Sequence, residues 1–319
     1  MRRRSSAPDG GLVVWKPRGP SSRQVIEQIE KRLGIRGLGH CGTLDPLASG
    51  VLVVIGGLAS RFQQMLTVHD KCYEATVWFG IQSLSGDAEG PLSCPYPRLA
   101  LPDLAQLEQL LPEFIGKQDQ FPPAHSAVRV KGQRSYKRAR LGDDSELPPS
   151  REIEIHSIDI IGMEGPRLKI RVECGPGTYI RSLARDLGQR LGCSSSLMAL
   201  RRISSGVHRE AEAILPDRVK FSDYCSLEEL LNQMPAVVVN QDQARRLGHG
   251  QSVDMTEVAS ESDTVSPIYG LGTTERSAMA PQVVWCQDQV CGIAQVEEAV
   301  LRPRRWIPEQ RNRRADQYI

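Results

Sequence analysis

Apolar residues recur at helical spacing in three stretches of the chain. Residues 21–33 predict an amphipathic helix whose apolar face is formed by Val25, Ile26, Ile29 and Leu33. Ser21 and Gln24 have the spacing of a capping box at its start. A run of leucines after Asp103 predicts a second helix over residues 104–111. A third helix is expected from Thr178 to about Leu191, with Gly192 as its stop.

Apolar and polar residues alternate in other stretches, which is the pattern of a half-buried strand. The alternation is clearest over residues 73–79, where Tyr73 shares a face with apolar residues. Further strands are predicted at residues 51–55, 124–130, 152–161 and 167–174. Because strands and helices do not alternate regularly, we expect an α+β fold with a mixed, largely antiparallel central sheet.

The pattern changes after about Leu231. Short strands are predicted at 237–239, 283–285 and 292–296, which indicates a small all-β module, and the polar stretch 259–279 is expected to form a long loop. No internal repeat is visible. We therefore expect four parts: a basic N-terminal segment (1–10), a large domain (11–231), a C-terminal domain (235–308) and a basic tail (309–319).

Composition agrees with a globular protein of about two domains. The chain has 319 residues, of which 40% are hydrophobic and 24% are charged. Its longest apolar run, residues 50–59, is about half a membrane span, and no apolar stretch follows the arginines at positions 2–4. We expect a cytoplasmic protein without a membrane contact. The eight cysteines form no C-x-x-C pair and no cysteine-histidine ladder, so we expect free thiols and no metal site.

Basic residues are concentrated in two places, although the net charge is only +2. Residues 129–140 read RVKGQRSYKRAR, with six basic residues, no acid and Tyr136 among them. This pattern is typical of a phosphate-binding surface. A second basic stretch lies at 302–319. The alternative interpretation of either stretch is a solvated face, and the intervening C-terminal domain has more acids than bases.

One carboxylate stands out. Asp45 lies in GHCGTLDPLASGVL (39–52), between glycines and directly before a proline, so the backbone there is biased away from helix and the carboxylate can stand at the mouth of a cleft. The alternative is a turn aspartate that bonds its own backbone. Arg181 falls in the first turn of the helix expected from Thr178, where the helix dipole disfavours a cation, so it should have an anionic partner. Asp45 is a candidate for that partner.

The same segment closely resembles the signature GHTGTLDPLATGVL of the TruB family of tRNA pseudouridine synthases. Five further segments resemble the family's motifs in the family's order, over about residues 11–208. They are GLVVWKPRGPSS (11–22), the tyrosine-bearing strand 71–80, QFPPAHSAVRVKGQRSYKRAR (120–140), CGPGTYIRSLARDLG (174–188) and LRRISSG (200–206).

The resemblance implies a pseudouridine synthase fold and the isomerisation of uridine to pseudouridine, at T-loop position 55 of tRNA, without a metal or another cofactor. Asp45 would be the nucleophile, adding to uracil C6 or to ribose C1′ of a flipped nucleotide; both routes stay open. Arg181 would pair with this carboxylate and keep it ionised against burial. Tyr73 would stack on the uracil and help to remove the C5 proton.

The resemblance also implies residues that bind the substrate. They are His40, Asp87, Tyr179 and Leu200 around the base, and Arg129, Lys131, Arg134 and Tyr136 in a segment of about residues 118–150 that contacts the T-arm. The partner would be tRNA, with no obligate protein partner, and we expect a monomer. Residues 292–308 resemble the end of the small PUA-like domain of bacterial members, which favours a stand-alone enzyme.

The sequence departs from the family pattern at three places. Cys41 and Ser49 replace threonines, and Pro176 stands at an often basic position, but none of these is a catalytic side chain. Two alternatives belong to other classes. A T-arm-binding protein or RNA chaperone would use the scaffold without catalysis, although Asp45, Tyr73 and Arg181 are all retained. An aspartyl-phosphate enzyme would need a second metal-binding aspartate near Asp45 or a P-loop lysine, and neither is present.

Overall fold

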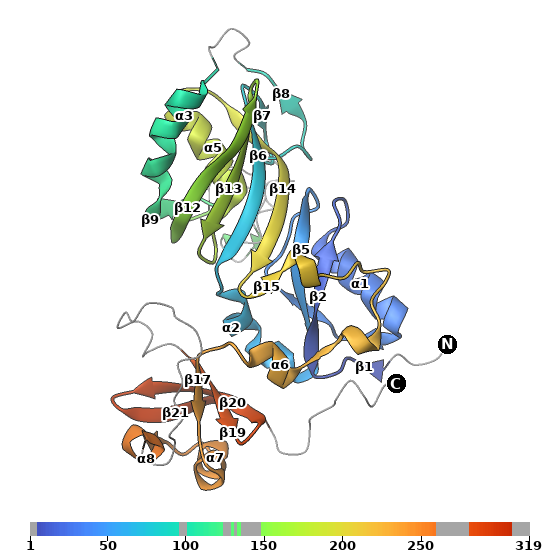
Figure 1. Cartoon of the computed structure of the whole chain (residues 1–319), viewed down its shortest axis with the longest axis vertical. Coiled ribbons are helices and arrows are strands. Elements are labelled where there is room, and N and C mark those ends of the chain that lie inside the picture. Colours follow the sequence, from blue (N-terminus) through green and yellow to red (C-terminus); the bar gives the residue numbers. More distant parts are fainter. Residues whose placement is uncertain are drawn as a thin grey trace.

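The computed structural model describes residues 5–95, 101–123, 148–259 and 281–307, together with the backbone of 129–130 and 133–134. A large sheet with its helices forms one end of the elongated molecule, and a small separate sheet forms the other (Figure 1). In these ranges no helix has the length and the apolar character needed to cross a membrane.

The large sheet is mixed and largely antiparallel, as predicted. Its strands, in spatial order, are β16 (Cys225–Ser226), β2 (Gly10–Lys16), β5 (Ala48–Gly56), β14 (Ser195–Ser205), β6 (Lys71–Phe79), β13 (Arg167–Cys174), β12 (Arg151–Glu164) and β9 (Gly116–Gln120). Two short strands extend it, β4 (Gly39–Cys41) on β5 and β15 (His208–Arg209) on β14. Among these described strands, β5 and β14 form the one parallel pair. This pair joins two halves of the sheet, and the strands within each half are antiparallel.

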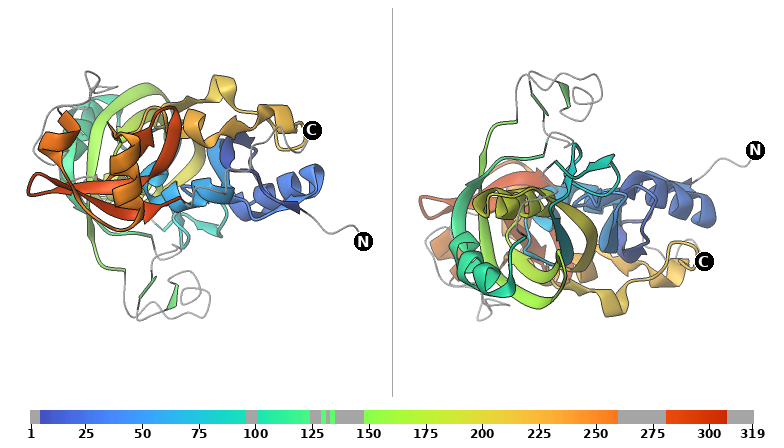
Figure 2. Two further views of the ribbon diagram at one scale, coloured as in Figure 1. Left: turned by 90° about the horizontal axis from the view of Figure 1, so that it is seen from below. Right: turned by 90° about the horizontal axis from the view of Figure 1, so that it is seen from above.

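The predicted helices cover this sheet. The helix α1 (Ser22–Leu33) has the predicted capping box of Ser21 and Gln24, and α3 (Leu104–Leu110) has another from Asp103. The helix α5 (Ile180–Arg190) starts two residues later than predicted, because Tyr179 is still extended. α3 and α5 pack their apolar faces onto the inward residues of β6 and β13, and the sheet curls around them (Figure 2).

Short elements connect these parts. They are β1 (Ser5–Ser6), β3 (Ile35–Arg36), η1 (Gly57–Phe62), α2 (Gln63–Thr67), β7 (Gln82–Ser83), β8 (Leu92–Ser93), η2 (Leu111–Phe114), η3 (Glu210–Glu212), η4 (Phe221–Asp223) and α6 (Leu227–Leu231). The strand predicted at 124–130 lies outside the described residues except for its end, where β10 (Arg129–Val130) pairs with β11 (Gln133–Arg134).

The C-terminal module is a five-stranded sheet in the order β17 (Ala236–Val238), β19 (Gln282–Cys286), β20 (Gln289–Glu297), β21 (Val300–Trp306) and β18 (Val253–Asp254). It also contains two short helices, α7 (Gln241–Gly248) and α8 (Met255–Ala259), beside the expected β-sheet. The module is therefore not purely β, in contrast to the expectation. The capping box of Asn240 and Gln243 is the sequence pattern from which α7 could have been predicted. Apart from Ala259, the predicted loop 259–279 falls outside the described residues.

The junction between the two halves of the large sheet depends on Gly50. The parallel ladder of β5 and β14 runs only from Leu200 opposite Ala48 to Arg202 opposite Gly50. Gly50 has a φ of 117°, and a Cβ there would lie 2.2 Å from the Arg202 carbonyl oxygen. A side chain at this position would therefore push the two halves of the sheet apart.

We expect Gly50→Ala to destabilise the protein by about 2 to 4 kcal/mol, because it adds a strained backbone conformation to a clash with a buried strand. Urea unfolding followed by circular dichroism measures this change. Gly162→Ala is the matched control, since Gly162 also lies in a strand and a Cβ there meets nothing within 4 Å. Equal stability of the two variants would show that the junction tolerates a side chain.

Candidate active site

A pocket of about 630 Å³ opens where the two halves of the large sheet meet. Five residues that the sequence analysis assigned to the site line it: Asp45, Tyr73, Tyr179, Arg181 and Leu200. They come from four segments, namely the loop before β5, strand β6, the start of α5 and strand β14. The fold therefore brings these distant motifs to one cavity.

The loop that carries Asp45 is held on both sides. The Ser22 hydroxyl donates to the Leu44 carbonyl and accepts from the Leu44 N–H, both at 2.9 Å. The Lys16 ammonium donates to the Ala48 carbonyl at 2.6 Å and reaches the Pro46 carbonyl at 3.4 Å. These bonds fix the backbone on either side of Asp45, so its side chain is presented from a rigid loop.

The carboxylate of Asp45 pairs with Arg181. The Arg181 Nε lies 3.0 Å from Asp45 Oδ2, which is the pairing that the position of Arg181 in the first helical turn led us to expect. The Arg181 side chain is only 6% exposed, whereas the Asp45 side chain is 36% exposed. The cation therefore lies behind the carboxylate, and the carboxylate faces the pocket.

A second carboxylate lies behind Arg181. Asp87 Oδ2 is 3.6 Å from Arg181 Nε, and its other oxygen accepts hydrogen bonds from the Ser85 hydroxyl and the Glu89 N–H. The Arg181 Nη1 also donates to the Ser85 carbonyl at 2.9 Å. Asp87 is 2% exposed and does not line the pocket, so its carboxylate lies against Arg181 on the side away from the cavity.

The pKa of Asp45 is raised above its usual value. Burial is the largest cause, Arg181 and Lys16 oppose it, and the nearby Asp87 adds to it. The sequence analysis expected Arg181 to offset burial, but here burial outweighs the ion pair. A carboxylate whose pKa is raised is more basic than an ordinary aspartate, which suits a nucleophile.

Tyr73 and Arg202 line the pocket from the neighbouring strands β6 and β14. Tyr73 is 7% exposed, and burial raises the pKa of its phenol, so the neutral form is favoured. Arg202 lies opposite Tyr73 in the ladder of β14 and β6, and its side chain donates to the carbonyls of Val51 and Gly42, at 2.7 and 3.1 Å. Arg202 therefore ties β14 to β5 and to the Asp45 loop.

Three buried cations in or beside the pocket were not singled out as site residues in the sequence: Lys16, Lys71 and Arg202. The Lys71 ammonium donates to the carbonyls of Thr67 and His69, and burial lowers the pKa of both lysines to about 8. The signal that could have identified Lys71 is a basic residue at an inward position of an alternating strand, in phase with Tyr73.

The remaining predicted binding residues are not part of the described pocket lining. His40 lies in β4, half-buried, outside the lining of this pocket, and burial lowers its pKa so that the neutral imidazole is favoured. The side chains of Arg129, Lys131, Arg134 and Tyr136 lie outside the described residues.

Within the described ranges, no cluster of three or more histidines, cysteines or acids could hold a metal ion. All eight cysteines are free thiols, as predicted.

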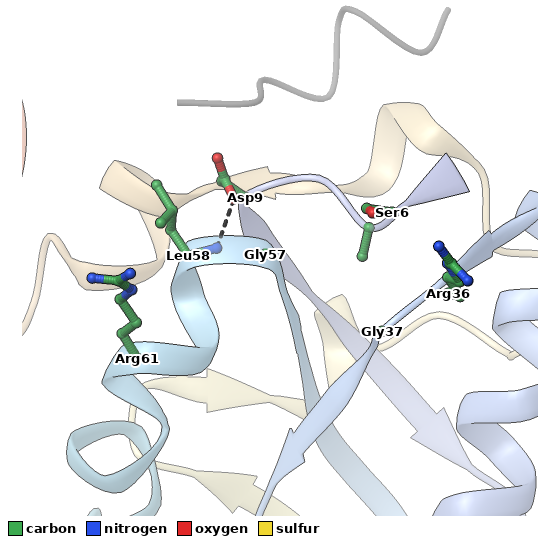
Figure 3. A pocket seen from close by; sticks show the side chains of 8 residues that line it. Ser6, Asp9, Arg36, Gly37, Gly57, Leu58 and Arg61 are labelled. Atoms are coloured by element: carbon green, nitrogen blue, oxygen red, sulfur yellow. Dashed lines mark hydrogen bonds between the residues drawn. The ribbon is translucent and has the colours of Figure 1, made fainter. Parts of the chain in front are cut away.

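A second hollow, of about 480 Å³, lies away from Asp45 and is lined by residues of β1, β3 and η1 (Figure 3). Asp9 on its wall accepts a hydrogen bond from the Leu58 N–H at 2.6 Å. Arg61 donates to the Trp306 carbonyl at 2.6 Å and so links η1 to the C-terminal module. These polar groups are used in packing, and the hollow contains none of the residues predicted for catalysis.

The chain is similar in sequence to a family of known proteins. A family model described as TruB family pseudouridylate synthase (N terminal domain) matches residues 30–180. The tRNA pseudouridine synthase B of Ralstonia pickettii (strain 12J) is 34% identical over 309 residues, which cover 93% of this chain and 94% of that one. The protein of the same name from Synechococcus sp. (strain WH7803) is 44% identical over 216 residues, covering 67% and 71%.

Solved structures show the same fold. A chain of a Cbf5-Nop10-Gar1 complex aligns over 97% of this chain and 86% of its own, with a TM-score of 0.67 and 22% identity. A chain of an H/ACA RNP bound to a substrate RNA containing 2'-deoxyuridine aligns over 94% and 86%, with a TM-score of 0.65 and 20% identity. The expected pseudouridine synthase fold is confirmed. Together with the extent of the match to the Ralstonia protein, this places the chain in the TruB family of pseudouridylate synthases.

Proposed function

We propose that this protein isomerises uridine to pseudouridine in tRNA, at position 55 of the T-loop, with Asp45 as the nucleophile. The observation that carries the proposal is the pairing of a pocket-facing carboxylate with a buried arginine, at 3.0 Å, in a chain that matches a tRNA pseudouridine synthase B over 93% of its length. The described pocket volume lies in the range typical of small-ligand sites, so it can accept a flipped nucleotide.

Asp45 would act through a covalent adduct. Its carboxylate forms a bond to uracil C6 or to ribose C1′, the glycosidic bond from N1 breaks, and the base rotates before C5 bonds to C1′. On the C1′ route the carboxylate leaves as C5 bonds to C1′, and on the C6 route it leaves together with the C5 proton. In both, C5 loses a proton and N1 takes one up, so the atoms of substrate and product balance without an oxidant or reductant. The contacts of Asp45 are compatible with either route.

Arg181 and Asp87 would set the charge at Asp45. Arg181 stabilises the ionised carboxylate, and Asp87 fixes the direction of the guanidinium from behind. Tyr73 and Leu200 would hold the uracil between an aromatic ring and an apolar side chain, with Tyr179 at the rim. The raised pKa of Tyr73 supports stacking by a neutral phenol more than removal of a proton by a phenolate.

The T-arm would bind along the basic segment of about residues 118–150, through Arg129, Lys131, Arg134 and Tyr136, with His40 close to the flipped base. We further propose that residues 11–231 form the catalytic domain, that residues 235–308 form a PUA-like domain, and that the protein acts as a monomer. Gel filtration coupled to light scattering tests the last point, with 35.3 kDa as the expected mass.

Replacing the nucleophile separates catalysis from binding. We expect Asp45→Asn to abolish tritium release from C5-tritiated uridine in an unmodified tRNA transcript, because the amide cannot form the covalent bond. The dissociation constant for tRNA should change less than about 3-fold, since binding is spread over many phosphate and stacking contacts.

A transcript with cytidine at the T-loop target is the substrate control and should also release nothing. Release by Asp45→Asn would contradict the role of Asp45. No release from any uridine by the wild type, with tRNA still bound, would favour the alternative of a T-arm-binding protein without catalysis.

Removing the cation behind Asp45 should change the pH dependence. Arg181 lowers the pKa of Asp45, so Arg181→Gln should raise this pKa further and move the acid limb of the single-turnover pH–rate profile to higher pH, by about one unit or more. Arg171→Gln is the matched control, because Arg171 pairs with Glu74 on the surface. An unshifted acid limb in a folded Arg181→Gln variant would show that another group sets the protonation of Asp45.

A further inference from the structure

Gln120 makes a two-point contact with the backbone of Tyr179. Its side-chain amide donates to the Tyr179 carbonyl at 3.1 Å and accepts from the Tyr179 N–H at 2.8 Å. Gln120 is only 4% exposed, at the end of β9, and Tyr179 is 59 residues further along the chain. A buried polar side chain that meets both backbone groups of a single residue fixes that residue's position and orientation.

The residue held in this way is the one that begins α5. Tyr179 is the N-cap of the helix, with φ of −100° and ψ of 111°, and its own side chain makes no capping hydrogen bond. Its carbonyl also accepts from the Leu183 N–H at 3.0 Å, in the first helical turn. Since the helix lacks a side-chain cap of its own, Gln120 supplies the contact that fixes where α5 starts.

Neighbouring contacts reinforce this attachment. The Ser182 hydroxyl and the Arg185 guanidinium both donate to the carbonyl of Phe121, the residue after Gln120, at 2.7 and 3.1 Å. Arg151, which pairs directly with Gln120 in the ladder of β12 and β9, lies over the Tyr179 ring at 5.3 Å from its centroid. The edge of the sheet formed by β9 and β12 therefore holds the start of α5 through several contacts.

The first turn of α5 carries half of the candidate active site. Tyr179 lines the pocket, and Arg181, two residues later, makes the 3.0 Å contact with Asp45. The other half, the Asp45 loop, is held separately by Lys16 and Ser22. The distance between Arg181 and Asp45 therefore depends on two independent attachments, and Gln120 belongs to the one on the α5 side.

We propose that Gln120 is a positioning residue for the isomerisation: through the backbone of Tyr179 it sets the placement of Tyr179 and Arg181 against Asp45. This inference rests on the proposed function of that site. Gln120 itself does not line the pocket, so it acts through other residues and does not contact the substrate. Misplacement of a catalytic group by about 1 Å can lower a rate on the order of 100-fold.

The test compares Gln120→Met, which keeps the side-chain length and removes both hydrogen bonds, with Gln120→Glu, which keeps the acceptor for the Tyr179 N–H. Gln243→Met is the matched control, because Gln243 is also 4% exposed and its amide bonds the Asn240 N–H and the Glu257 carbonyl, in the C-terminal module and not at α5. The assay is the single-turnover rate of tritium release from C5-tritiated tRNA transcript, with tRNA affinity measured for each variant in the Asp45→Asn background.

We expect Gln120→Met to lower the single-turnover rate about 10- to 100-fold, with tRNA affinity changed less than about 3-fold. Its acid limb should move to higher pH, because a displaced Arg181 no longer lowers the pKa of Asp45 as far. Gln120→Glu should lose less, and Gln243→Met should stay within about 2-fold of the wild type. If Gln120→Met does not fold, the rate and acid limb of Gln120→Glu decide the question by the same criteria.

Hydrogen exchange of the peptide spanning residues 176–190 gives a readout that needs no turnover. Faster exchange in the Gln120 variants, and not in Gln243→Met, is expected if Gln120 holds the start of α5. A lower melting temperature with an unchanged rate and acid limb would overturn the proposal, since a merely structural role predicts that result. Absence of tritium release from the wild type would overturn the proposed function. Unchanged hydrogen exchange in the Gln120 variants would overturn the positioning role of Gln120, whether or not the wild type is active.

Discussion

The ion pair between Asp45 and Arg181 is the interaction on which the candidate site depends, and its two members are unequally buried. Arg181 is almost fully enclosed, whereas Asp45 keeps about a third of its side-chain surface in the pocket. A buried cation is costly without a partner, so Arg181 needs a carboxylate for the fold as well as for chemistry. Asp87 supplies a second carboxylate at 3.6 Å, which leaves Asp45 able to react while the arginine stays compensated.

The sheet explains how two such residues meet. Asp45 precedes β5, whereas Arg181 follows β13 and begins the helix that leads to β14. The parallel pairing of β5 with β14 brings the start of one strand beside the middle of the other, and it exists only because Gly50 lets the backbones approach. The two halves of the sheet are otherwise antiparallel. The site therefore lies at the parallel pairing of the described sheet, where side chains from both halves can converge.

Local patterns were enough to predict the helices α1, α3 and α5 and an anionic partner for Arg181, and they failed where contacts are distant in the sequence. Ser21 and Gln24 predicted the start of α1, and the position of Arg181 in a first helical turn predicted an anionic partner, because both signals act within one helical turn. No local pattern shows that Gln120 bonds a backbone 59 residues away. Lys71 was missed for a related reason, since a lysine in an alternating strand is ordinarily expected on the exposed face.

The buried cations give the pocket a charge that its own carboxylates do not balance. Lys16, Lys71 and Arg202 direct their hydrogen bonds to backbone carbonyls, which satisfy the donors but carry no formal charge. The described residues that line the pocket include three cations, Lys71, Arg181 and Arg202, against one carboxylate, Asp45, while the carboxylates of Asp87, Glu89 and Asp70 lie nearby outside the lining. Lysines with a pKa of about 8 are mostly protonated at neutral pH, so the empty pocket is electropositive. A polyanion such as RNA relieves this excess when it binds, so part of its attraction arises at the reacting site itself.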